Sequence, residues 1–210
     1  MIDLYLIRHG ESEVNKTPQF IGGRTNHSPL SQGGIIQAER LGCFLHNQQV
    51  TFDEVYSSTA VRAIHTAKIT CLEIGYPLED IIQSEELLEI SQGDWEGKLR
   101  AETYTPEVLK NLLLDTWNFK APNGESQKEV EERGYAWIEK TLLSRSEKDL
   151  TVGVFTHGLT TRCILRKILN SDPSMTYYLV TDNTSITRLV YVNNRWRLIK
   201  LNETSHLYNY

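Results

Sequence analysis

Two apolar runs dominate the hydrophobic pattern of the chain. Residues 2–7 and 151–156 are apolar at nearly every position rather than at every second one. Strands covered by helices on both faces show this pattern, because neither face of such a strand meets water. We therefore predict that both segments are central strands of one sheet. A shorter strand that begins near Phe52 and closes at residues 56–59 is predicted beside them.

Amphipathic segments lie between these strands. Three of them follow a residue type that caps helix N-termini, namely Ser31, Thr59 and Ser126. Ser126 is followed three residues later by Glu129, which predicts a capping box. A further helix is expected directly after Gly158. Alternation of strands and helices along the whole chain is typical of an α/β fold.

The C-terminal part of the chain predicts a β-hairpin. Residues 185–192 and 195–201 are rich in β-formers and are separated by Asn193-Asn194, a pair that favours a tight turn. The predicted fold is a three-layer α/β/α sandwich with a mostly parallel central sheet and one antiparallel strand near the C-terminus. We expect a single domain over residues 1–210, with a lid-like insertion at about 98–121.

Net charge and the N-terminal pattern narrow the possible partners. The 210 residues carry a formal net charge of −5, which provides no basic face for nucleic acid. The first apolar run is broken by Asp3 and ended by Arg8, so it is too short for a signal peptide or a membrane span. We therefore expect a cytoplasmic protein with no nucleic-acid or membrane partner.

Neither cysteines nor carboxylates indicate a metal site. Cys43, Cys71 and Cys163 lack the paired short spacings of disulfide frameworks and zinc sites, and are expected to be reduced core thiols within helices. No carboxylates cluster at metal-ligand spacing near the predicted strand ends. Neither a metal nor a cofactor is expected.

Cationic side chains gather at the predicted strand ends. Arg8 and His9 end the first strand, His157 ends the strand at 151–156, and Arg62 lies in the first turn of a helix. Ligands of open α/β sheets bind beyond the carboxyl ends of the strands, so these four groups are expected to meet. Two guanidiniums suit a dianionic phosphate monoester, and they disfavour protonation of His9, which leaves it nucleophilic. We expect His157 to be a further donor to the phosphoryl oxygens.

A leaving alkoxide also requires a proton. Glu89 lies between apolar Leu88 and Ile90, and is the best candidate for an acid that then serves as base for the incoming water. Glu96 is a competitor, but glycines on either side of Trp95 favour a structural turn there.

These residues belong to an ordered series of motifs. In chain order the series comprises residues 6–12 (LIRHGES) with Asn15, 29–31 with Gly33 or Gly34 and 37–38, 57–58 with 62–63 and 66–67, Glu89 with Gly93 and 95–97, 123–126 (NGES), and 157–158. The series resembles the histidine phosphatase superfamily, the phosphoglycerate-mutase-like fold, over nearly the whole chain. One departure is His27, which stands where the commoner family pattern has an acidic residue.

The resemblance implies specific roles. His9 would become a transient phosphohistidine, Arg8, Arg62 and His157 would hold the phosphoryl group, and Glu89 would move the proton. Asn15 and a backbone amide near Gly22 or Gly23 would complete the phosphate pocket.

Within the superfamily, the resemblance favours the broad-specificity phosphatase branch. Glycolytic mutases place an arginine just after the acid and have a long basic insertion, whereas here Ile90 follows Glu89 and the segment 98–121 is short. We expect a metal-independent phosphomonoesterase that acts on a small phosphorylated metabolite. Arg24 and Lys120 are hypothesised to bind a second anionic group. A phosphoglycerate mutase and a catalytically idle phosphate-binding domain remain alternatives, and the substrate, the pathway and the oligomeric state stay open.

Overall fold

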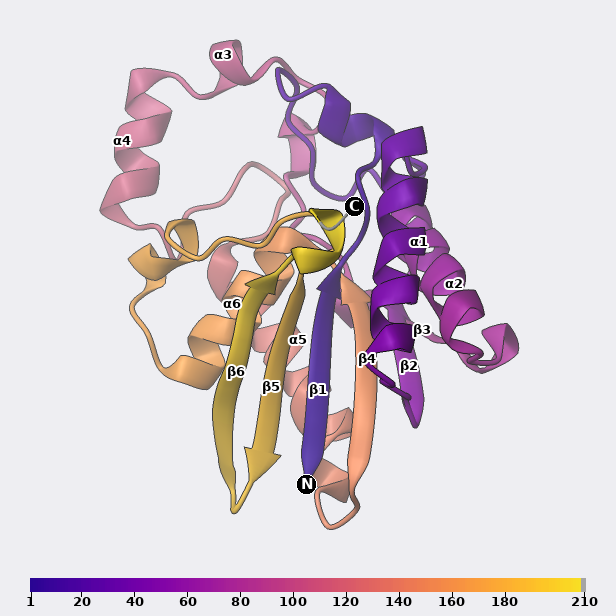
Figure 1. Ribbon diagram of the computed structural model, residues 1–210. Coiled ribbons are helices and arrows are strands. Elements are labelled where there is room, and N and C mark those ends of the chain that lie inside the picture. Colours follow the sequence, from indigo (N-terminus) through magenta and orange to yellow (C-terminus); the bar gives the residue numbers. More distant parts are fainter. Residues whose placement is uncertain (209–210) are drawn as a thin grey trace.

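A central β-sheet organises the molecule. The computed structural model describes residues 1–208, with six strands in the order β3-β2-β4-β1-β5-β6 (Figure 1). β1 (Ile2–Arg8) and β4 (Leu150–Thr156) lie at the centre and pair in parallel over their full lengths. β2 (Glu54–Ser58) and β3 (Ile82–Ser84) extend the parallel part. The prediction that the two apolar runs are central strands is confirmed.

The C-terminal hairpin forms the other edge of the sheet. β5 (Ile186–Val192) is antiparallel to both β1 and β6 (Arg195–Glu203), so β5 is the strand that runs against the other five. Asn193 and Asn194 connect β5 to β6 at φ angles of 52° and 59°. A tight turn of this hand requires positive φ at both central residues, and asparagine tolerates it well. The predicted hairpin and its single reversed strand are confirmed.

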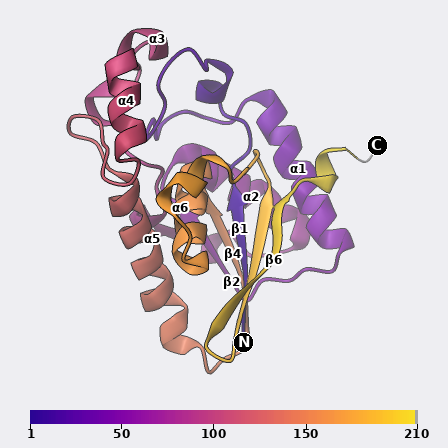
Figure 2. The ribbon, with the colours of Figure 1, turned by 90° about the vertical axis from the view of Figure 1, so that its left-hand side faces the viewer.

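Helices cover both faces of the sheet, which confirms the three-layer α/β/α fold. One face carries α1 (Gln32–Asn47) and α2 (Val61–Ile74), and the other carries α5 (Gln127–Thr141) and α6 (Gly158–Leu169) (Figure 2). Side chains of β1 alternate between the two resulting cores. Ile2, Leu4 and Leu6 pack with residues of α5 and α6, whereas Tyr5 and Ile7 pack with residues of α1 and α2. The alternation explains why β1 is apolar at successive positions.

Two of the three predicted helix caps form. The Ser31 side chain accepts the amide of Gly34 at the start of α1, and Ser126 and Glu129 form the predicted capping box of α5. The expectation for Thr59 is wrong, because α2 begins at Val61 with Ala60 as its N-cap residue. The Ser58 hydroxyl accepts the amide of Ala60 and delays the helix by one residue.

Cys71 and Cys163 are buried, as expected, but Cys43 is exposed. Cys43 lies on the outer side of α1, where its Sγ atom is 3.8 Å from a carboxylate oxygen of Glu73 on α2. The expectation of a core thiol is therefore wrong for Cys43.

The segment 98–121 stands at the end of the molecule toward which β1 points (Figure 1). It contains α3 (Arg100–Thr103) and α4 (Pro106–Leu114), the second capped by the Thr105 side chain. None of the residues of α4 is buried, so the helix adds nothing to either core. Among residues 1–208, we find no helix with the length and apolarity needed to cross a bilayer.

Candidate active site

A cavity of about 540 Å³ opens beyond the carboxyl end of β1. We call it the strand-end cavity. Eleven residues from the β1 end, the following loop, α2, the Glu89 segment and α3 line it: Arg8, His9, Val14, Asn15, Pro18, Phe20, Gly22, Gly23, Arg62, Glu89 and Arg100.

His9 is held in one orientation at the end of β1. Its amide donates to the carbonyl of Thr156 on β4, and its Nδ1 atom lies 2.7 Å from the carbonyl oxygen of Gly10. Because a carbonyl can only accept, Nδ1 carries the hydrogen, and Nε2 is left as the acceptor. The Nε atom of Arg62 donates to this Nε2 at 3.1 Å. The imidazole therefore presents a lone pair beside a guanidinium.

Burial and charge keep His9 neutral. The residue is 3% exposed. Burial lowers its pKa well below the ordinary value, and the guanidiniums of Arg62 and Arg8 lower it further. A neutral imidazole with an unprotonated Nε2 has the protonation state that nucleophilic attack requires.

Close packing explains the glycine that follows His9. A Cβ atom at Gly10 would come within 2.6 Å of the carbonyl oxygen of Gly34 in the first turn of α1. The loop after β1 can approach α1 this closely because neither residue has a side chain. The approach fixes the backbone on which His9 is placed.

Arg62 links the groups of the site. Nη1 donates to the Thr25 carbonyl at 2.8 Å, and Nη2 donates to the Gly23 carbonyl at 3.1 Å. The same Nη2 lies 3.2 Å from Nδ1 of His157. The guanidinium therefore connects both histidines with the loop that crosses over them.

Arg8 lines the cavity and keeps one buried guanidinium donor unpaired within the described residues. Its Nη1 atom donates to the carbonyl of Thr181 at 2.7 Å. Its Nε atom is buried and has no partner among the described residues. The positive charge that Arg8 brings to the cavity favours an anionic ligand there.

His157 lies behind Arg62 and not on the cavity wall. It is fully buried, and its ring centroid is 5.0 Å from that of His9. Because Nδ1 accepts from Arg62, Nε2 carries the hydrogen and donates to the hydroxyl of Ser58 at 2.8 Å. Burial lowers the pKa of His157 well below its ordinary value, with Arg62 as the next cause. His157 thus supports Arg62 in this structure, and its expected donation to the phosphoryl oxygens stays a prediction.

Glu89 contacts the N-terminus of α6. One of its carboxylate oxygens accepts from the amide and the hydroxyl of Thr160, both at 3.1 Å, and the other accepts from the amide of Leu159 at 3.2 Å. His157, the N-cap residue of α6, provides no side-chain cap. The Glu89 side chain therefore satisfies helix amides that would otherwise be free.

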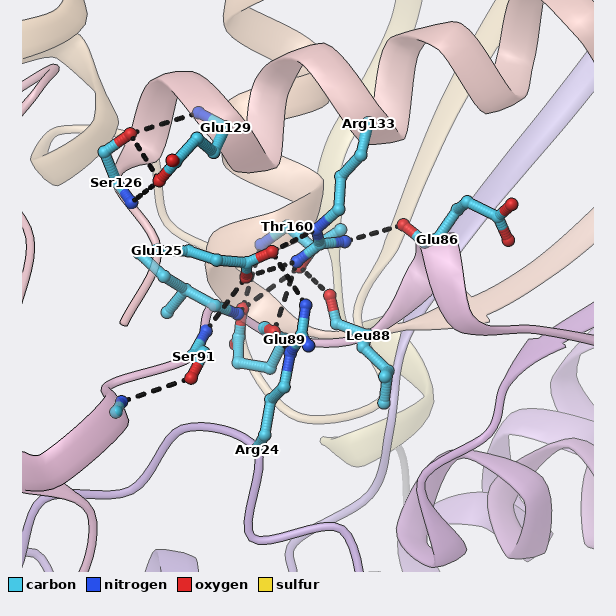
Figure 3. A network of polar contacts seen from close by, with 12 residues as sticks. Arg24, Glu86, Leu88, Glu89, Ser91, Glu125, Ser126, Glu129, Arg133 and Thr160 are labelled. Atoms are coloured by element: carbon cyan, nitrogen blue, oxygen red, sulfur yellow. Dashed lines mark hydrogen bonds and ion pairs between the residues drawn. The ribbon is translucent and has the colours of Figure 1, made fainter. Parts of the chain in front are cut away.

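Two arginines fix the backbone of Glu89 (Figure 3). Nε of Arg24 and Nη2 of Arg133 both donate to the Glu89 carbonyl, each at 3.2 Å. Glu125 lies between the two arginines, accepting from Arg24 at 2.7 Å and from Arg133 at 3.0 Å. It also accepts the amide of Ser91. We call Arg24, Glu125 and Arg133 the Glu89 clamp.

Neither Arg24 nor Lys120 is among the residues that line the strand-end cavity. Arg24 is engaged in the clamp, and Lys120 pairs with Glu129 of the α5 capping box at 2.8 Å. The sequence shows Arg24 and Lys120 as cations, but it does not show that Glu125 and Glu129 are their partners. Glu96, the competitor of Glu89, accepts the amides of Arg24 and Gln92, so its carboxylate holds a turn.

Asn15, Gly22 and Gly23 line the cavity. The Asn15 side-chain oxygen accepts from the amide and the hydroxyl of Ser12. The NH₂ group of Asn15 takes no part in these two hydrogen bonds. Asn183, from the loop before β5, donates to the His9 carbonyl at 2.9 Å.

From the sequence, no role was assigned to Ser58, Arg100 or Asn183. The Ser57-Ser58 pair beside Arg62 was a signal for the first, whereas nothing local marked Arg100. Within residues 1–208, no three His, Cys, Asp or Glu side chains are grouped so that they could hold a metal ion.

Comparison with known proteins decides the family. The sequence model of the histidine phosphatase superfamily (branch 1) matches residues 4–204. The chain belongs to this superfamily. The match confirms both the resemblance and the expectation of a histidine-type phosphatase enzyme.

Individual relatives in the superfamily carry different names. The chain is 32% identical to a 2,3-bisphosphoglycerate-dependent phosphoglycerate mutase of Parvibaculum lavamentivorans, with 79% of each sequence covered. It is 30% identical to a probable phosphoglycerate mutase, GpmB, of Yersinia pestis, over 93% of this chain and 88% of that one. A phosphoserine phosphatase mutant of Entamoeba histolytica, solved with phosphoserine, superposes with a TM-score of 0.82 at 26% identity, over 99% and 100% of the two chains. The names are divided between mutase and phosphatase.

Proposed function

We propose that the chain is a metal-independent phosphomonoesterase that works through a phosphohistidine on His9. The observation that carries the proposal is the neutral, buried imidazole of His9, whose Nε2 accepts from Arg62 and whose pKa is lowered by burial and by the charges of Arg62 and Arg8. Those cations supply the positive charge that a dianionic phosphoryl group needs. A small phosphorylated molecule is the substrate class that a cavity of about 540 Å³ admits.

The reaction has two steps. In the first, Nε2 of His9 attacks phosphorus, the bond from phosphorus to the ester oxygen breaks, and protonated Glu89 gives its proton to the departing alkoxide. In the second, water attacks the phosphohistidine, the Glu89 carboxylate takes a proton from that water, and the bond from phosphorus to nitrogen breaks. Inorganic phosphate and neutral His9 result, so Glu89 and His9 return to their starting states.

Arg62 changes partners when phosphate binds. In the structure its Nε atom bonds to Nε2 of His9, so this donor must turn to a phosphoryl oxygen before attack. His157 then loses the donor to its Nδ1. If the Ser58 hydroxyl donates to Nε2 of His157, the ring carries its hydrogen on Nδ1 and becomes a donor to the phosphoryl group. Ser58 is thus proposed to let His157 switch from accepting to donating.

The charges around the cavity support a phosphatase more than a mutase. A mutase must hold two phosphates and a carboxylate while the intermediate reorients, which requires cations beyond those at the phosphoryl group. Arg24 and Lys120, the hypothesised sites for a second anion, are paired with Glu125 and Glu129. Their engagement leaves the second-anion hypothesis without support from the geometry.

Phosphoglycerate mutase remains the second candidate. Arg100 also lines the cavity and has no carboxylate partner among the ion pairs of residues 1–208. The relatives at 30% and 32% identity are named as mutases. Conversion of 3-phosphoglycerate in the presence of 2,3-bisphosphoglycerate tests this candidate directly.

The deciding experiment measures hydrolysis and the covalent intermediate together. We expect hydrolysis of p-nitrophenyl phosphate in the presence of a chelator, and a mass increase of one phosphoryl group after quenching without acid. His9→Ala should abolish both. His65→Ala, an exposed histidine on α2, is the matched control and should retain both.

Each other outcome has a clear meaning. Full activity of His9→Ala contradicts the proposed nucleophile. Phosphate binding without turnover of any ester in a panel of sugar phosphates, phosphoserine and phosphoglycerates indicates the idle binding domain. Isomerisation of 3-phosphoglycerate that is faster than hydrolysis makes the chain a mutase.

A further inference from the structure

A second concavity lies beside the strand-end cavity, between α4 and the 3-10 helix Pro173–Tyr177. We call it the insertion groove. Its volume is about 740 Å³, larger than that of the strand-end cavity. Ten residues line it: Arg100, Ala101, Tyr104, Leu109, Leu112, Leu113, Thr116, Ser174, Tyr177 and Tyr178.

The lining of the insertion groove is apolar. Leucines of α4 form one wall and tyrosines form the other, and no carboxylate is among the lining residues. Leu113 is 74% exposed and Tyr178 is 77% exposed. Contiguous exposed apolar surface of this kind marks a binding site, because its contact with water is unfavourable until a ligand covers it.

The insertion groove adjoins the strand-end cavity at Arg100, the one residue among those described that lines both. Arg100 Nε donates to the carbonyl of Pro18, a residue of the strand-end cavity, at 3.3 Å. Its guanidinium lies 5.3 Å from the ring centroid of Tyr104, a residue of the insertion groove. A ligand whose phosphate lies beside His9 would reach the groove by passing the side chain of Arg100.

Aromatic packing holds the junction in place. The Tyr104 ring packs edge-on against Trp95 at a centroid distance of 5.6 Å, and Trp95 also contacts Phe119 at 5.9 Å. The two ends of the insertion are thereby fixed to the turn that follows Glu89. The groove wall is joined to the site at which the leaving group departs.

We propose that the insertion groove binds the apolar part of the substrate's alcohol. The substrate class is then a phosphomonoester of an alkyl or aromatic alcohol, with its phosphate at His9 and its chain along α4. This inference rests on the proposed phosphatase function. The absence of lining carboxylates and the single cation at the junction fit a ligand that is anionic at one end and apolar at the other.

Binding of n-alkylphosphonates tests the groove without requiring turnover. These compounds keep a phosphate-like head and cannot be hydrolysed. We expect the Kd measured by calorimetry to fall about twofold for each methylene from ethyl- to octylphosphonate, which is less than a fully buried methylene gives because the groove is open to water on one side. A Kd that does not change with chain length overturns the inference.

Two adjacent leucines provide a matched pair of variants. Leu113 and Leu114 are both 74% exposed on α4, but only Leu113 is among the groove-lining residues. Leu113→Asp should flatten the chain-length series and leave ethylphosphonate binding unchanged, while Leu114→Asp should retain the wild-type slope. Neither change threatens folding, because no residue of α4 is buried. Equal slopes in the two variants overturn the inference.

Further readouts separate this inference from the proposed function and from a rival occupant. A chain-length slope in phosphonate binding without hydrolysis of any alkyl phosphate supports the groove and contradicts the phosphatase. Hydrolysis with a flat series supports the phosphatase and overturns the groove. Sedimentation of the wild type and of Leu113→Asp detects a second copy in the groove. A dimer that Leu113→Asp dissociates overturns the substrate assignment.

Discussion

His206 gives the protein a stability that depends on pH. It lies in the 3-10 helix Ser205–Leu207 and is 3% exposed. Its Nε2 atom lies 2.9 Å from the Thr184 hydroxyl, and its Nδ1 atom has no partner among the described residues. The pKa of His206 is lowered from 6.5 to about 4, chiefly by burial; Glu203 acts in the opposite direction, and Arg40 adds a smaller lowering.

The direction of the effect follows from proton binding. Between pH 6.5 and 4 the unfolded chain binds a proton at this histidine and the folded chain does not, so acid favours unfolding. The contribution of His206 to stability is complete above pH 6.5 and is lost as the pH falls toward 4. Between pH 7 and pH 5 the loss is about 2 kcal/mol in the free energy of unfolding.

Urea unfolding at pH 7 and pH 5 tests the calculation. We expect the wild type to lose about 2 kcal/mol more than His206→Gln between these values, because glutamine does not titrate. His9 and His157 have lowered pKa values too, but they contribute equally to both proteins and cancel in the difference. His65→Gln, at an exposed position, should behave as the wild type. The same pH dependence in wild type and His206→Gln would refute the reasoning.

Three further predictions concern the site. Arg62→Lys should lower kcat/KM about 10²–10³-fold, because one ammonium cannot replace two charge-assisted hydrogen bonds to phosphate. The control Arg195→Lys, at an exposed position, should leave kcat/KM unchanged. Glu89→Gln should slow hydrolysis of alkyl phosphates about a hundredfold or more. Hydrolysis of p-nitrophenyl phosphate should slow much less, because nitrophenolate leaves without a proton. Equal losses for the two substrates would exclude Glu89 as the acid. Glu125→Gln should loosen the Glu89 clamp and lower kcat about tenfold or more, while the inhibition constant of inorganic phosphate stays within twofold. The control Lys120→Met should change neither kcat nor this inhibition constant.

The parts of the fold that depend on local pattern could be predicted from the sequence. Continuous apolar runs predict β1 and β4, since a strand buried on both faces needs apolar residues at every position. The Ser126–Glu129 pair and the Asn193-Asn194 turn act within a few residues, so they too can be recognised locally. Thr59 failed as a cap because the preceding turn is held by the hydroxyl of Ser58, a contact that composition does not show.

The sequence predicts which site residues approach one another where these residues lie at the ends of strands. Arg8 and His9 end one strand, and parallel pairing brings the end of its neighbour alongside, so their approach to His157 follows from topology. Contacts between distant loops could not be predicted. Arg24 is 101 residues from its partner Glu125, so the sequence shows a free cation where the structure has an ion pair.

The separation of α4 from both cores has an evolutionary consequence. Substitutions on a helix that buries none of its side chains scarcely change folding stability, so selection can alter them freely. The strand ends, by contrast, are fixed by packing on both faces of the sheet. With the substrate's alcohol bound along α4 as proposed, a lineage with this architecture can exchange one alcohol for another by changes in a single outlying segment, while the groups proposed to act on phosphorus are inherited intact.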